Sequence, residues 1–270
     1  MISDIRSPVA VLSRLAAALA KAGPGLLAFA ILLLAWQLYA QLSGIRPTTL
    51  PSPVRVVEQA LLHRDALIEN TFPTVRATLL GFACSLSTAF ALSVMVDFHR
   101  PLRRALFPIF IVSQTLPLVA IAPLVVLWFG FGLAPKIMLV ALVTFFPMLV
   151  ALVQGYESTE PEIELLLHSM GASRRRMFLL ARLPSALPYF FAGLRISITY
   201  AVVGAIFAEY AGAAKGLGIY ILNAKNNFRP DLVLAAVGVS AALTLILFGA
   251  TILLQRLAMP WARTALERRP

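Results

Sequence analysis

Six apolar runs divide this chain of 270 residues, and each is long enough to cross a lipid bilayer as a helix. A membrane-spanning helix needs about 20 mostly apolar residues. Because lipid offers no partner for backbone polar groups, such runs form helices rather than irregular segments. The runs lie near Leu26–Leu42, Phe72–Val96, Ala105–Phe129, Lys136–Val153, Pro188–Ala208 and Leu232–Leu254. The sequence therefore predicts an all-α integral membrane protein with six transmembrane helices.

The composition indicates lipid rather than water as the main environment. The chain is 60% hydrophobic and only 13% charged, whereas soluble domains carry about 25% charged residues. The net charge is +11, and in a nucleic-acid-binding protein such an excess gathers in one patch or stripe. Here the basic residues form short clusters between apolar runs. A nucleic-acid partner is therefore not expected.

The distribution of lysine and arginine predicts which side of the membrane each loop faces. Loops rich in basic residues are retained on the cytoplasmic side. One set of alternating segments holds 14 basic residues and the other holds 7. The richer set comprises Arg6, Arg14, Lys21, Arg100, Arg103, Arg104, Arg174, Arg175, Arg176, Arg182, Arg256, Arg263, Arg268 and Arg269. Both termini and the loop between the fourth and fifth runs are therefore predicted to be cytoplasmic.

This topology divides the chain into five regions. They are 1–25 (cytoplasmic amino-terminal segment), 26–45 (first transmembrane helix), 46–71 (periplasmic helix and loop), 72–256 (core transmembrane domain) and 257–270 (cytoplasmic tail). The first region lacks the compact apolar core of a signal peptide and is predicted to be an amphipathic helix, with a disordered tail as the alternative. In the third region, Ser52 is predicted to cap a short helix with Pro53 in its first turn.

The loop between the fourth and fifth runs has readable local chemistry. Thr159 and Glu162 have the spacing of a capping box, which predicts a helix beginning there. Gly171 is predicted to end that helix, since glycine adopts positive φ at little cost. Ser173 is predicted to cap a second short helix, and Pro184 to end it. The product is a helix, a sharp turn and a second helix at the cytoplasmic face.

Three positions in this loop carry a family resemblance. Gly171, Leu183 and Pro184 have the spacing of the signature of binding-protein-dependent ABC importer permeases, which reads E-A-A, three residues, G, nine residues, I, one residue, L-P. Ala181 replaces the isoleucine, and Leu165 stands where the signature has glutamate. The segments LPSPVRVV (50–57), PLVVLWFGFG (123–132) and GLGIYIL (216–222) resemble the nitrate, sulfonate and taurine branch, with thiamine-pyrimidine-precursor members most similar.

The resemblance implies a transporter subunit that is not itself an enzyme. Expected partners are a dimer of cytoplasmic ATPases, a periplasmic substrate-binding protein, membrane lipid and a second permease copy, commonly identical, in the bacterial inner membrane. ATP and Mg would belong to the ATPase, because the chain has no phosphate-cradling loop of the form G-x-x-x-x-G-K-[ST]; no cofactor and no metal site are expected in it. Coupling to the ATPase is expected from Glu162, Glu164, Leu167, Gly171, Ala172, Ser173, Arg175, Leu183 and Pro184.

Polar residues within the apolar runs are candidates for the substrate pathway, because they are costly in lipid. The third run carries Ser113, Gln114 and Thr115 just before Pro117, roughly half-way across the membrane. Interhelical hydrogen bonding is the alternative reading. Glu209 ends the fifth run, where a gate, a docking residue and a simple interface anchor all remain open.

The expected substrate is a small organic solute such as a thiamine pyrimidine precursor. Nitrate, sulfonate or taurine import is the alternative within the family. A secondary transporter would carry ionisable pairs at mid-membrane or repeated broken helices, and an intramembrane enzyme would carry paired acids, a metal cluster or a nucleophile with its base. The sequence shows none of these clearly.

Overall fold

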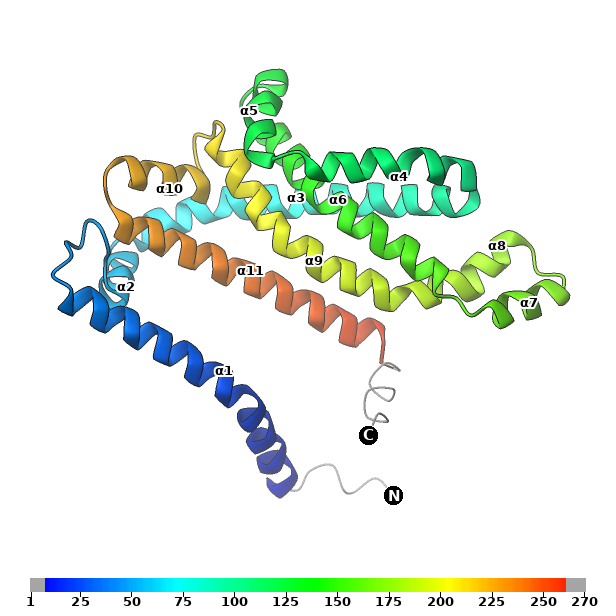
Figure 1. Cartoon of the computed structure of the whole chain (residues 1–270), viewed down its shortest axis with the longest axis horizontal. Coiled ribbons are helices and arrows are strands. Elements are labelled where there is room, and N and C mark those ends of the chain that lie inside the picture. The colour runs from blue at the N-terminus through cyan, green and yellow to red at the C-terminus, as the bar shows by residue number, and fades with distance from the viewer. Residues whose placement is uncertain (1–7, 261–270) are drawn as a thin grey trace.

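The computed structural model describes residues 8–260, which form helices joined by short turns (Figure 1). The predictions for residues 1–7 and 261–270 lie outside this described part of the chain. The helices are α1 (Pro8–Leu42), α2 (Pro53–Leu62), α3 (Arg64–Phe98), α4 (Arg100–Thr115), α5 (Leu118–Phe129), α6 (Leu133–Glu157), α7 (Pro161–Ser169), α8 (Arg174–Met177), the π-helical turn η1 (Phe178–Arg182), α9 (Leu183–Tyr210), α10 (Leu217–Asn226) and α11 (Pro230–Ala258).

Five stretches of the described chain are long and apolar enough to cross a membrane. They are Gly23–Leu42, Arg64–Phe98, Leu133–Glu157, Arg174–Tyr210 and Pro230–Ala258. Each contains one predicted run, so the structure has a helix over each of these five runs. The multi-pass, helical membrane architecture follows from them.

The third predicted run, Ala105–Phe129, is not one continuous helix. It is broken into α4 and α5, whose axes are bent by 102°. The break falls at Leu116 and Pro117, which both have extended backbone angles. Proline lacks the N–H for the helical ladder and pushes the residue before it out of helical geometry. Only the bent pair taken together is long enough to count as a sixth span.

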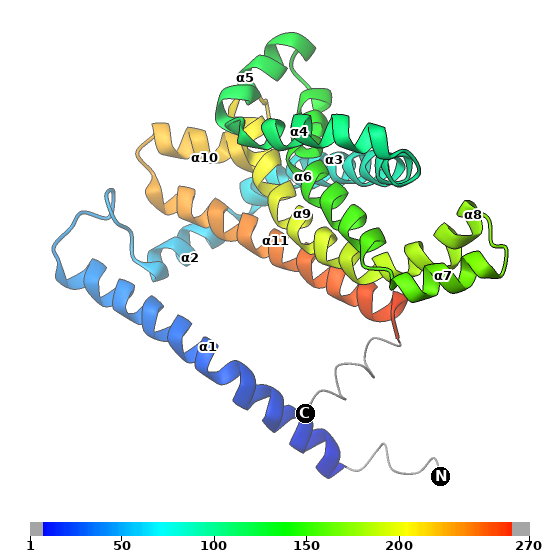
Figure 2. The same cartoon turned by 45° about the vertical axis from the view of Figure 1, so that its right-hand side comes forward.

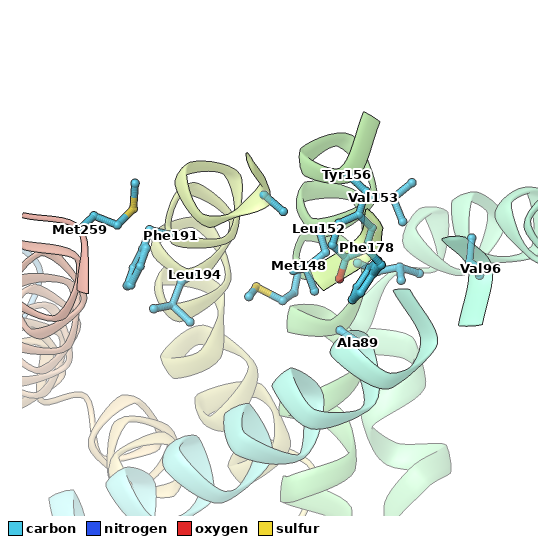
Figure 3. Packing of buried hydrophobic residues seen from close by; sticks show 12 residues of the cluster. Ala89, Val96, Met148, Leu152, Val153, Tyr156, Phe178, Phe191, Leu194 and Met259 are labelled. Atoms are coloured by element: carbon cyan, nitrogen blue, oxygen red, sulfur yellow. The ribbon is translucent and has the colours of Figure 1, made fainter. Parts of the chain in front are cut away.

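The core of the molecule is the packing of α3, α6 and α9. Small residues allow these helices to approach closely, as is common between membrane helices. A Cβ added to Gly155 of α6 would lie 2.7 Å from the Ala186 Cα of α9, so only glycine fits there. The largest buried cluster includes Leu152, Tyr156 and Phe178, and joins these helices to the end of α11 (Figure 3).

The short helices lie at opposite ends of this core. The segments α7 and α8 project at one end, and α2 and α10 lie at the other (Figures 1 and 2). Ser52 Oγ accepts a hydrogen bond from the Arg55 N–H at 3.4 Å, which confirms the predicted cap of α2. Helix α1 lies apart from the core and contacts it mainly through α2. It runs unbroken from Pro8 to Leu42, so the amino-terminal segment is not a separate helix.

Candidate functional site: the hairpin, the α10 end and the bent helix

The segment from α7 to α9 forms the hairpin predicted between the fourth and fifth runs, but its first helix starts differently. The helix cap is Glu160, with no side-chain hydrogen bond, and Pro161 follows it. Thr159 is buried, and its hydroxyl donates backwards to the Tyr156 carbonyl at 3.0 Å. The predicted capping box of Thr159 and Glu162 is therefore wrong, because the Thr159 hydroxyl is already bound to the end of α6.

Gly171 makes the turn between the two short helices, as predicted. Its φ is +75°, in the left-handed region that favours glycine. The Gly171 N–H donates to the His168 carbonyl and the Ala172 N–H to the Leu167 carbonyl, both at 2.9 Å. This pair of bonds is the Schellman arrangement that closes a helix end. A Cβ at Gly171 would meet nothing within 4 Å, so the constraint is backbone conformation rather than space.

The second helix begins as predicted and ends differently. Ser173 Oγ accepts from the Arg176 N–H at 3.4 Å, which confirms its cap. The helix does not end at Pro184, however, but passes through η1 into α9. Within this turn the Leu183 N–H donates to the Phe178 carbonyl, five residues back. Since Pro184 has no N–H to continue the usual ladder, a π-helical turn just before it keeps the helix unbroken.

The hairpin presents an apolar surface beside a basic one. None of the side chains of α7 is buried. Leu165, Leu166 and Met170 are at least 59% exposed, and Arg175 is exposed with its two arginine neighbours. Of the predicted coupling residues, Glu162, Gly171, Ser173, Arg175 and Pro184 are exposed, whereas Glu164, Leu167, Ala172 and Leu183 are partly buried.

An ion cluster at the base of the hairpin joins three helical segments. Arg182 Nε donates to Glu164 Oε1 at 2.8 Å, and Nη2 donates to Oε2 at 3.2 Å. The same guanidinium donates through Nη1 to Asp97 Oδ1, at the end of α3, at 2.7 Å. The sequence analysis did not single out Asp97. One feature of the sequence could have drawn attention to Asp97: it is the only acidic residue between Glu69 and Glu157.

At the α10 end, Glu209 is enclosed rather than exposed. Its side chain has 0% exposure. The carboxylate accepts hydrogen bonds from the Thr74 hydroxyl at 2.9 Å and the Gly218 N–H at 2.8 Å. Its Oε1 lies 3.5 Å from Lys136 Nζ. Glu209 thus joins α3, α6, α9 and α10, and it is not a surface anchor.

Neighbouring hydrogen bonds fix the segment that leads into α10. The Leu217 N–H donates to Thr74 Oγ1 at 2.8 Å, and the Gly216 N–H donates to Asn70 Oδ1 at 2.9 Å. Gly216 has φ +143°, and a Cβ there would collide with the Glu209 carboxylate. Buried polar groups therefore hold the turn before α10 in place.

The predicted pathway residues in the third run lie at the bend between α4 and α5. Ser113 and Thr115 donate to the carbonyls of Phe110 and Val112, within α4. Gln114 and Pro117 are exposed in the single chain. Within residues 8–260, no hydrogen bond joins the Gln114 amide to another residue. This amide is therefore free to contact a partner or solute at the bend.

The helical hairpin and its signature spacing agree with a family comparison. Residues 81–263 match the model of the binding-protein-dependent transport system inner membrane component. The chain belongs to this family. The match includes the core helices α6 and α9, the second half of α3, the α7–α8 hairpin and α10. The protein is thus a membrane permease component of an ABC importer, and its family is one of transport permeases rather than enzymes.

Several characterised relatives cover most of the chain. The formylaminopyrimidine transport permease protein ThiX of Halalkalibacterium halodurans is 34% identical over 87% of this chain and 94% of its own length. The riboflavin transport system permease protein RibX of Chloroflexus aurantiacus is 36% identical over 86% of this chain and 87% of its own. The taurine transport system permease protein TauC of Escherichia coli is 30% identical over 86% of this chain and 87% of its own length.

A solved structure shows the same fold. Inward-facing MetNI, a methionine ABC transporter, contains a chain that superposes with a TM-score of 0.59 at 17% identity. The superposition covers 74% of this chain and 97% of that one. At this identity the likeness supports the arrangement of helices alone.

Proposed function

We propose that this chain forms the substrate pathway of a bacterial inner-membrane importer and is driven by a separate ATPase. The observation that carries the proposal is the family match, because it contains the protruding hairpin in one continuous segment with the core helices. The exposed apolar side chains of α7 suit insertion into a groove of the ATPase, which would hold the ATP and Mg. A periplasmic binding protein would deliver the solute at the α10 end.

The pathway is proposed to run past the bend between α4 and α5. Free polar groups and irregular backbone at membrane depth are tolerated where they face protein or a water-filled cavity. Gln114, Thr115 and Pro117 are exposed on the single chain, which suits a path shared with a second, identical copy. Ser113 lies beside them. Glu209 would act as part of the wall, since its carboxylate is enclosed by four helices.

The proposed substrate is an aromatic nitrogen heterocycle of the thiamine-precursor type. Relatives named for formylaminopyrimidine and riboflavin share 34% and 36% identity with the chain. Relatives named for aliphatic sulfonates and taurine share 27% and 30%.

Reconstitution of the whole complex tests this function. The permease would be placed in vesicles with its partner ATPase and binding protein, and uptake of labelled formylaminopyrimidine and taurine would be compared. We expect formylaminopyrimidine uptake that requires both ATP and the binding protein. Uptake without the ATPase would contradict the importer mechanism and indicate a secondary transporter. Taurine uptake alone would contradict only the substrate class.

A further inference from the structure

The ion cluster of Asp97, Glu164 and Arg182 is the best-defined polar link between the hairpin and the core. Arg182 binds Glu164 of α7 through two nitrogens, and Asp97 of α3 through a third. The side chains of Asp97, Glu164 and Arg182 are 12%, 28% and 27% exposed. Planar, two-point contacts of this kind fix the relative orientation of the groups as well as their distance.

The remaining contacts of α7 are weak by comparison. This helix has no buried side chain, so hydrophobic packing does not lock it against the core. Two cavities, of about 700 and 320 Å³, lie at the cluster, and both are lined by Asp97 and Arg182. The cluster therefore bridges a region that packing leaves open.

Arg182 is placed for this role by the local backbone. It is the last residue of the π-helical turn that precedes Pro184. Such turns change the direction in which following side chains point, and they recur at functional sites. On the other side, Asp97 is one residue from Phe98, whose ring lies 5.5 Å from that of Phe178 in the same π-helical turn. An aromatic contact and the ion cluster therefore both join the end of α3 to η1.

We propose that Asp97, Glu164 and Arg182 act together as a strut that transmits movement of α7 to α3. In this arrangement Asp97 and Arg182 are positioning residues, which touch neither ATP nor solute. The inference rests on the proposed function, because it assumes that an ATPase moves α7. It adds a specific route from the hairpin into the transmembrane core through two contacts in series, Glu164 to Arg182 and Arg182 to Asp97.

A link in series has a distinctive mutational signature. Breaking either contact interrupts the whole link, so breaking both costs no more than breaking one. Independent contributions to stability would instead add. The test uses Asp97→Asn, Glu164→Gln and the double variant in the reconstituted complex, because these amides keep side-chain volume. The measured quantity is solute transported per ATP hydrolysed, with the loaded binding protein present.

We expect each single variant to hydrolyse ATP while transport per ATP falls by about fivefold or more, the lower range of coupling between sites. The double variant should show the same loss as the singles. Asp97→Glu keeps a carboxylate and should restore most of the ratio. Glu157→Gln is the matched control, since it removes the nearby Arg103–Glu157 ion pair between α4 and α6, which is not one of the two contacts in series. It should leave the ratio unchanged.

Subunit yield and thermal unfolding measured beside transport detect misfolding. If Asp97→Asn fails to assemble, Glu164→Gln still tests the strut, because Glu164 lies on a helix with no buried side chain. A wild-type ratio in Glu164→Gln, or a double variant whose loss is the product of the single losses, would overturn the strut. Absence of ATP-dependent transport in the unmodified complex would overturn the proposed function itself and the strut with it.

Discussion

Glu209 and Gln114 are both polar side chains in apolar helices, but their surroundings differ. Glu209 has 0% exposure and is bound to Thr74, Lys136 and the Gly218 N–H. Gln114 is exposed in the single chain, at the bend between α4 and α5. Burial of a charge is tolerated only when its partners are present. The two residues should therefore respond to substitution in different ways.

Glu209→Ala should lower stability, whereas Gln114→Leu should lower transport. Removing one partner from a buried ion pair costs about 3–5 kcal/mol, since it leaves the other charge uncompensated. An interhelical hydrogen bond in a membrane averages only about 0.6 kcal/mol, so Gln114→Leu should preserve yield even if Gln114 makes one in the assembled complex. Subunit yield, unfolding temperature and uptake are measured for both variants, with Thr115→Val as a second pathway variant on α4.

Two results would contradict this contrast. Normal uptake at normal yield by both Gln114→Leu and Thr115→Val would remove these residues from the pathway. Normal yield and unfolding temperature in Glu209→Ala would show that the buried carboxylate is not needed to hold α10 against α3 and α6.

At the scale of the element, the α7–α8 hairpin depends on one backbone conformation. Gly171 has φ +75°, which costs a β-branched residue about 1–3 kcal/mol. Gly171→Val should therefore deform the turn and reduce transport, while membrane insertion and yield remain normal. Gly171→Asn is the matched control, because asparagine adopts the left-handed region more readily. Equal transport by the Val and Asn variants would show that this turn does not set the position of α7.

The sequence predicted those parts of the hairpin that depend on neighbouring residues. The Gly171 turn and the Ser173 cap are local, and both are confirmed. Thr159 was misassigned because its partner, the Tyr156 carbonyl, became available only where α6 ends. Pro184 was predicted to end a helix, yet a π-helical turn lets the helix continue. Proline limits the hydrogen-bond pattern, but tertiary packing decides whether the chain bends, as it does at Pro117.

At the scale of the whole molecule, both ends carry ion pairs between segments distant in sequence. At the α10 end, ion pairs join Arg55 and Arg229 to Asp231, Lys136 to Glu209 and Lys215 to Glu69. At the hairpin end, no ion pair within residues 8–260 involves Arg174, Arg175 or Arg176. The length of the apolar runs was enough to predict five long helices. The ion pairs of Asp97 and Lys136 could not be predicted in this way, because their partners are distant in sequence and no local pattern encodes them.

The distribution of basic residues along the chain also predicts the orientation of the molecule, which is directly testable. Because basic loops stay in the cytoplasm, we predict that the hairpin faces inward and the segment before α10 faces outward. Cys84 is free and exposed, so Cys84→Ser provides the background for single-cysteine labelling. In intact cells whose outer membrane has been permeabilised, a reagent that cannot cross the inner membrane should label Lys215→Cys. It should label Arg175→Cys only after lysis. The side chains of Lys215 and Arg175 are both exposed, so burial would not prevent labelling at either position. Labelling of Arg175→Cys before lysis would reverse the assigned orientation and place the hairpin out of reach of any cytoplasmic ATPase.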